Sequence, residues 1–230
     1  MKRFLLAVAC AGLLFPAATW AKKSLTPADH VVVTLADGST VQGYLYDHWY
    51  KGQYASTVPN TKFSIVEKMD DEKDDRDEYT VNDVTAIDFT SPEVKPAHYR
   101  ACKVAYFDTE KLMQLLINYK YQIMARDSAS AHATIYRCTV LVPATVGDNV
   151  LYEAEQYGVM MEGNPVVYPI VTGGKLDLEA MYHHLRGGKN GKFTRFMKNH
   201  FKKKKNRKAV ERSPQAFLQV YEEYLSSLSK

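Results

Sequence analysis

His183 and His184 are the side chains whose type most directly suggests chemistry, because imidazole is a common zinc ligand. They stand in "LEAMYHHLRGG", whose apolar residues have helical spacing and whose two glycines predict the helix end. Neighbouring residues on a helix point about 100° apart, whereas two helical zinc ligands stand four residues apart. The pair therefore predicts histidines at a helix surface or core edge, and we expect neither a metal nor a cofactor.

Seven carboxylates in "MDDEKDDRDE" offer a second kind of chemistry, since clustered oxygen ligands bind calcium. The run has no glycine to make the turn of a calcium loop, lacks the EF-hand spacing, and contains Lys73 and Arg76. Clustered like charges repel one another and are typically solvated. We therefore expect a solvent-exposed hairpin tip here rather than a calcium site.

The glycines of the chain fall outside the common catalytic frames. "TGGK" and "RGGKNGK" fit neither phosphate-loop motif, and no G-x-S-x-G nucleophile elbow occurs. We therefore name no catalytic residue and expect a binding or scaffolding protein without catalytic activity. The alternative is a hydrolase of an unfamiliar type that acts on a cell-wall or dietary polymer.

A dense run of positive charge surrounds "FKKKKNRKAVER". Between Arg186 and Arg212 the chain has twelve Lys or Arg residues and one acid, Glu211. The predicted contacts are with an anionic membrane surface, an acidic glycan or an acidic protein, while nucleic acid is not expected. A solvated helix end is the alternative. The candidate binding residues of this run are Lys202, Lys203, Lys204, Lys205, Arg207 and Lys208.

A second candidate contact is the aromatic group in "DHWYKGQY". Trp49, Tyr50 and Tyr54 flank a predicted loop and could grip a peptide or a sugar, because aromatic rings combine a large apolar face with a polar edge. The alternative is ordinary packing of a β-hairpin.

The first residues have the pattern of a secretory signal peptide. Lys2 and Arg3 precede a short apolar run, and the small-residue frame ending at Ala21 predicts a signal peptide over residues 1–21. The run is too short for a membrane-spanning helix, which needs roughly 20 apolar residues; lipidation at Cys10 is a further alternative. Cleavage removes two basic residues and no acid, lowering the formal charge from +4 by 2 to +2. We expect an exported protein of the periplasm or cell surface.

Cys102 and Cys138 remain after this cleavage, each in an apolar, strand-like segment. In an oxidising compartment they can form a disulfide, which would contribute roughly 3 to 4 kcal/mol by the chain-entropy estimate. The alternative is two buried free thiols that pack as small apolar side chains.

Residues 24–92 predict a small β domain. "HVVVTLADGSTVQGYLYDHWY" alternates like two strands joined at Asp37-Gly38, and Gly43 in the second strand suggests a bulge or strong bend. "KFSIVEK" and "EYTVNDVTAIDF" predict three more short strands. Five short strands favour an SH3/Sm-like β-barrel or curled sheet, and two prolines then predict a linker over residues 93–99.

Residues 100–230 predict an α+β domain, so the fold class of the whole chain is α+β. A short helix over "TEKLMQLLINY" precedes β-rich segments whose short connections favour an antiparallel β-meander. From Leu176 the apolar period becomes helical, in "FTRFMKNHF" and then in "SPQAFLQVYEEYLSSL". These C-terminal amphipathic helices must pack on another element, and the meander is the nearest candidate.

The combined pattern "VTLADGSTVQGYL", "YTVNDVTAIDF", a meander and a basic, aromatic helical tail resembles uncharacterised secreted proteins of Bacteroidota. The resemblance covers most of the chain after residue 21, and its motifs are generic. It implies a protein of the cell envelope and supplies no activity, so no catalytic residue follows from it.

Overall fold

The computed structural model describes residues 25–46, 62–70, 75–107, 117–143, 151–185 and 190–228. A 3₁₀-helix, η1 (Pro27–Asp29), precedes the first strand. The strands are β1 (His30–Leu35), β2 (Thr40–Leu45), β3 (Lys62–Val66), β4 (Asp77–Thr80), β5 (Val84–Phe89), β6 (His98–Phe107), β7 (Ile117–Ala129), β8 (Ala133–Pro143), β9 (Leu151–Met161), β10 (Val166–Thr172) and β11 (Lys175–Leu176). The helices are α1 (Glu179–His184), α2 (Asn190–His200), α3 (Lys204–Arg212) and α4 (Ala216–Leu228). The predicted α+β class is confirmed.

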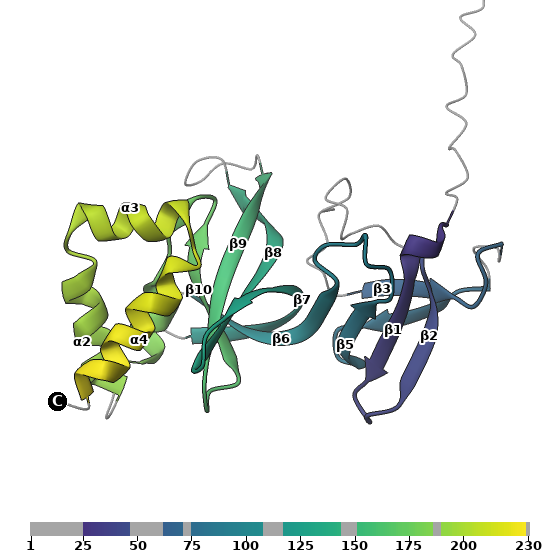
Figure 1. The fold of residues 1–230 in the computed structure, drawn as a ribbon, viewed down its shortest axis with the longest axis horizontal. Helices are drawn as coiled ribbons and strands as arrows, with labels where there is room; N and C mark the ends of the chain where they lie inside the picture. Colours follow the sequence, from purple (N-terminus) through teal and green to yellow (C-terminus); the bar gives the residue numbers. More distant parts are fainter. Residues whose placement is uncertain are drawn as a thin grey trace, which may run out of the picture.

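The N-terminal strands form an antiparallel sheet in the order β5-β1-β2-β3-β4 (Figure 1). Alternate residues of β1 face its core, because Val31 and Val33 are fully buried there beside Leu45 and Phe63. The hairpin predicted at Asp37-Gly38 joins β1 to β2. Among the strand pairs of the described residues, none joins β4 to β5, so this sheet is curled without a closing pair.

Of the bulge or strong bend predicted at Gly43, the bulge is wrong, because Gly43 lies in regular register opposite Val31. The reason for a glycine is a close approach: a Cβ added to Gly43 would lie 2.6 Å from the carbonyl oxygen of Val66 at the end of β3. The residue therefore lets two backbones meet, which no larger side chain would permit.

The N-terminal sheet continues directly into the second half of the chain. β6 begins at His98, inside the segment predicted as a linker over residues 93–99, and pairs with β5 through Asp88 opposite His98. Tyr99 of β6 and Ile123 of β7 join the apolar core of the N-terminal sheet. The two halves thus share both a sheet edge and a core.

Strands β6 to β10 close into a five-stranded barrel. Successive strands pair antiparallel, as predicted for the meander, and β10 then returns to pair in parallel with β6. The sequence predicted an antiparallel meander without predicting its closure, which comes from long strands that curl and from irregular register in β7 and β10. β7 already begins at Ile117, so the last residues of the helix predicted over "TEKLMQLLINY" are strand, and residues 108–116 lie outside the described part.

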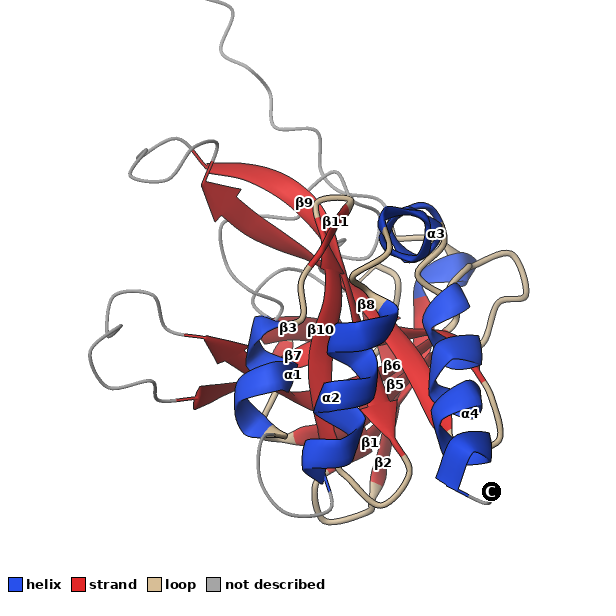
Figure 2. Ribbon diagram, turned by 90° about the vertical axis from the view of Figure 1, so that its left-hand side faces the viewer, coloured by secondary structure: helices blue, strands red, loops and turns tan. Residues whose placement is uncertain are grey.

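Each barrel strand alternates between the interior and the exterior. Cys102, Val104, Met124, Cys138 and Val167 form the interior cluster. The exterior of the barrel packs against two other layers of the chain. One part contacts the N-terminal sheet, and another contacts the helices, which lie together on the other side of the barrel (Figures 1 and 2). The barrel is therefore the central layer of the molecule.

The helices cover the barrel with an aromatic core, as the amphipathic pattern predicted. Phe193 of α2 contacts the rings of Tyr221 and Tyr224 of α4, with centroids 5.5 and 4.8 Å apart. Phe201, just after α2, stacks on Phe217 of α4, and both side chains are buried. Packing of these rings, together with Val210 of α3, fixes the three helices relative to one another.

We predict that Gly158→Ala destabilises the protein by about 1–3 kcal/mol, the usual cost of overpacking a core. A Cβ on Gly158 would lie 2.5 Å from Cγ1 of Val167, whose branched side chain is fully buried in the barrel. Urea denaturation of Gly158→Ala, Val167→Ala and the double variant measures the effect. Because Val167→Ala vacates the clashing volume, we expect the second substitution to offset part of the first; strictly additive losses would contradict this reason.

Candidate functional site

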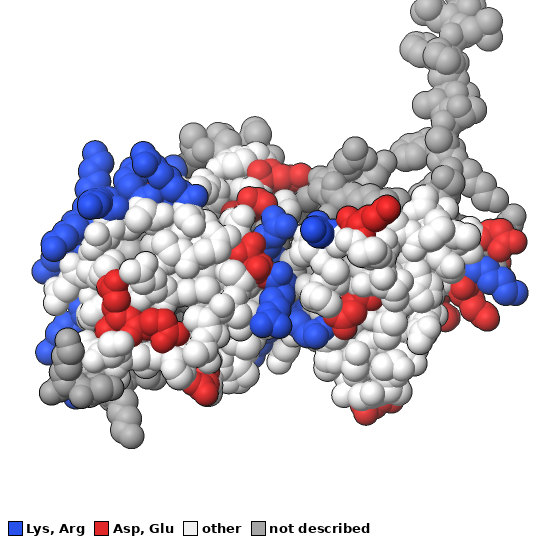
Figure 3. Space-filling view, in the orientation of Figure 1, with Lys and Arg blue, Asp and Glu red and all other residues white. Residues whose placement is uncertain are grey.

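The predicted basic residues gather at the corner between α2 and α3. Lys202 and Lys203 follow α2, Lys204 and Lys205 begin α3, and Arg207 and Lys208 complete the set. All six side chains are exposed, and we call them the basic surface. In Figure 3 blue side chains crowd the end of the molecule where Figure 1 shows α2 and α3. The run thus comprises the turn after α2 and the first part of the further helix α3.

Two side chains of this corner have a structural role. Asn206 Nδ2 donates to the carbonyl oxygen of His200 at 2.8 Å, and Arg207 donates to that of Phe201 at 2.9 Å. The last carbonyls of a helix have no partner within it, so these bonds cap α2. Arg207, predicted as a binding residue, therefore also holds α3 in place against α2.

The charges of the basic surface are unequally neutralised. Lys208 forms an ion pair with Glu211 at 2.7 Å, and this hydrogen bond lowers the pKa of the Glu211 carboxyl below its ordinary value. Within the described residues no ion pair involves the four lysines from Lys202 to Lys205. Lys203 is the N-cap of α3 and makes no capping bond with its side chain. Because the positive end of the helix dipole lies here too, the corner favours an anion.

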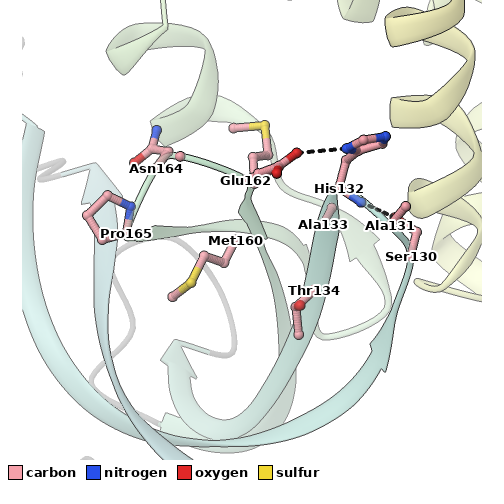
Figure 4. A pocket seen from close by; sticks show the side chains of 11 residues that line it. Ser130, Ala131, His132, Ala133, Thr134, Met160, Glu162, Asn164 and Pro165 are labelled. Atoms are coloured by element: carbon pink, nitrogen blue, oxygen red, sulfur yellow. Dashed lines mark hydrogen bonds and ion pairs between the residues drawn. The ribbon is translucent and has the colours of Figure 1, made fainter.

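A pocket of about 480 Å³ lies at one end of the barrel, between the β8 and β9 strands and the turn that follows β9 (Figure 4). His132 and Glu162 point toward one another on its rim, with Nδ1 and Oε2 2.7 Å apart. The hydrogen bond that His132 donates to Glu162 raises the pKa of His132, and the nearby Glu222 carboxylate adds to this shift. Sequence reasoning missed this pair, because His132 and Glu162 are isolated in sequence.

The serine next to this histidine is directed elsewhere. Ser130 Oγ donates to Glu222 Oε1 of α4 at 2.7 Å, while His132 Nε2 lies 4.0 Å from the other carboxylate oxygen. A serine nucleophile requires its hydroxyl to donate to the base. The contacts instead tie α4 to the β7–β8 turn, and Gln215 adds a second tie by donating to Asp127 at 2.7 Å.

His184, one of the paired histidines, lies at the core edge as predicted. Its Nδ1 is hydrogen-bonded to the hydroxyl of Tyr168, and its Nε2 lies 3.1 Å from that of Tyr119. Burial, followed by the charge of Lys103, lowers the pKa of His184, and burial raises the pKa of Tyr168 to about 12. These three side chains thus link α1 to β7 and β10.

Cys102 and Cys138 are free thiols in the structure and belong to one buried cluster inside the barrel. Burial raises the pKa of each thiol to about 12. A thiol with such a pKa is a poor nucleophile, because the thiolate is the reactive form. A disulfide between them stays a prediction.

Other predicted sites are only partly within the described residues. Trp49, Tyr50 and Tyr54 lie outside them, as does part of the acidic run. In the part of the chain that is described, no group of three His, Cys, Asp or Glu residues could hold a metal ion. In the same part, no helix is long and apolar enough to cross a membrane.

Comparison of the chain with models of protein families, with curated proteins and with solved structures found no match. Its function has to be inferred from its own residues.

We predict that the imidazole of His132 titrates above the ordinary value of 6.5, because Glu162 stabilises its charged form. A pKa raised in the folded state contributes stability below the unfolded pKa, and this contribution is lost as pH rises through the folded pKa. His132→Gln should therefore lower the free energy of unfolding at pH 5 and leave it unchanged at pH 9. Urea denaturation at both pH values measures the free energy of unfolding. NMR titration measures the pKa of the His132 ring in the wild type and, as the control, in Glu162→Gln. A wild-type ring that titrates at the ordinary pKa contradicts the prediction.

We predict that neither barrel thiol reacts with a thiol reagent in the native protein at pH 8, where the protonated form dominates. In the chain beginning at Lys22, which lacks Cys10, denaturation without reductant should release two reactive thiols if the cysteines are free. The measurement is mass spectrometry after alkylation. Labelling only after reduction would establish the disulfide instead.

Proposed function

We propose that this chain is an exported cell-envelope protein, without catalytic activity, that binds an anionic membrane surface through the basic surface at the α2–α3 corner. The observation that carries the proposal is four consecutive exposed lysines without an ion pair among the described residues. Each basic group near an anionic leaflet contributes about 1 kcal/mol. The signal-peptide pattern of residues 1–21 supports export, and the resemblance to secreted proteins of Bacteroidota supports an envelope location.

The geometry of the corner supports a surface rather than one small anion as the ligand. The lysines leave the end of α2 and the start of α3 in different directions, because successive side chains diverge around a helix and a turn. Arg207 and Asn206 fix the angle between the two helices. A spread of cations held on a rigid corner suits many headgroups at once.

The N-terminal half serves in this proposal as a second contact module of SH3/Sm-like type. The strand order β5-β1-β2-β3-β4, with short strands and a curled sheet, supports that assignment. Trp49, Tyr50 and Tyr54 fall in the connection between β2 and β3, and they remain the candidate residues for a peptide or sugar ligand.

We predict that Lys203→Gln/Lys204→Gln/Lys205→Gln weakens binding to anionic vesicles by at least about tenfold, since three charges contribute about 1 kcal/mol each. The measurement is co-sedimentation with vesicles of phosphatidylglycerol and phosphatidylcholine at low salt. Binding by the wild-type protein should fade in half-molar salt, because exposed charges are then screened within a few ångströms, roughly 3–5 Å.

The matched control removes the same charge from elsewhere: Lys62→Gln/Lys95→Gln/Arg126→Gln, three exposed residues distant in sequence from the corner. This variant should bind as the wild type does. Equal loss in both variants would reduce the effect to net charge, and binding of the wild type to neutral vesicles alone would contradict the proposal.

A further inference from the structure

A second pocket lies beside the basic surface, where β11 and α1 meet the end of α2. Its volume is about 390 Å³, within the range of roughly 300–1,000 Å³ typical of ligand sites and near its lower end. The lining residues are Leu176, Leu178, Glu179, Tyr182, Lys198, Phe201, Lys202 and Arg207. The pocket therefore combines an apolar floor with charged groups.

The floor is apolar and well supported from behind. Leu178 and Phe201 are buried members of the helix–barrel core, and Leu176 and Tyr182 are half-buried against it. Burial raises the pKa of Tyr182 to about 12, so its ring stays neutral at physiological pH. A floor of this kind takes alkyl or aromatic groups out of water.

The rim carries three cations against one carboxylate, Glu179. Lys198 Nζ lies 5.3 Å from the centroid of the Tyr182 ring, which places this ammonium group directly over the apolar floor. Lys202 is exposed, and Arg207 already donates to main-chain carbonyls of the corner. Arg207 uses Nη1 for these bonds, whereas in the described part of the chain the ammonium groups of Lys198 and Lys202 donate no hydrogen bond, so all their donors are available to a ligand.

We propose that this pocket binds a single-chain anionic amphiphile, with the alkyl chain on the apolar floor and the carboxylate, sulfate or phosphate head between Lys198 and Lys202. The inference rests on the proposed function for the anionic character of the ligand, and it adds a chain-binding site that the membrane contact does not require. The small volume favours the monomer of a one-chain amphiphile over a two-chain lipid.

Isothermal titration calorimetry with dodecanoate below its micelle concentration tests the proposal. Each buried methylene contributes about fourfold in affinity, so dodecanoate should bind at least about tenfold more tightly than octanoate even with partial burial of the chain. Acetate, which has the charge without the chain, should show no heat of binding. Dodecyl maltoside, which has the chain without the charge, should bind more weakly than dodecanoate.

The variants separate pocket from surface. Lys198→Gln/Lys202→Gln should weaken dodecanoate binding by about tenfold or more, because both charged hydrogen bonds to the head are lost. Lys204→Gln/Lys205→Gln removes the same charge from the first turn of α3, outside the lining, and should leave dodecanoate binding within about twofold. All four lysines are exposed, so their replacement leaves the core unchanged. A filling variant, Leu176→Trp, should abolish dodecanoate binding, with its thermal unfolding compared with the wild type as a check on folding.

The outcomes for the two proposals differ. Dodecanoate binding that is lost in the rim variant and kept in the α3 variant supports the pocket, whether or not vesicles bind. Absence of dodecanoate binding in the wild-type protein, or equal weakening by both lysine pairs, overturns the pocket proposal. Vesicle binding that persists in that case leaves the proposed surface function standing by itself.

Discussion

The parallel contact between β6 and β10 is the constraint on which the rest of the structure depends. Two residue pairs form it, Val166 with Lys103 and Val167 with Val104, and they turn an antiparallel meander into a closed barrel. Closure gives every barrel strand a true inside and a true outside. The inside is filled mainly by apolar side chains, while the outside supplies one face to the N-terminal sheet and another to the helices. Without it, neither layer would have a rigid surface to pack on.

Local sequence patterns were sufficient to predict most strands and helices, but they did not predict how these elements assemble. The alternation of apolar and polar residues in β1 and β2 is a property of residues close together in the chain, and so are the apolar stripes of α2 and α4. A single sequence is therefore enough to predict these elements. The pairing of Val167 with Val104 joins segments far apart in the chain and has no local signal. Gly43 shows the same limit, because the carbonyl of Val66 that explains it comes from another strand.

The candidate site also has features that the sequence predicts and features that only the fold explains. The exposure of Lys202 to Lys205 follows from their charge density, which can be recognised in the sequence. The capping role of Arg207 depends on carbonyls released at the end of α2, and the pairing of His132 with Glu162 depends on the register of β8 with β9. These roles belong to the fold, and residue types alone could not predict them.

The position of α4 has a consequence for how the chain acquires its structure. Phe217 and its neighbours in α4 belong to the same buried cluster as Ile135 of β8 and Tyr168 of β10, which are synthesised earlier. Until α4 emerges, the cluster lacks its last helix, and the native core stays incomplete. For the exported chain proposed above, the native core would therefore form only once the barrel and α4 are on the same side of the membrane.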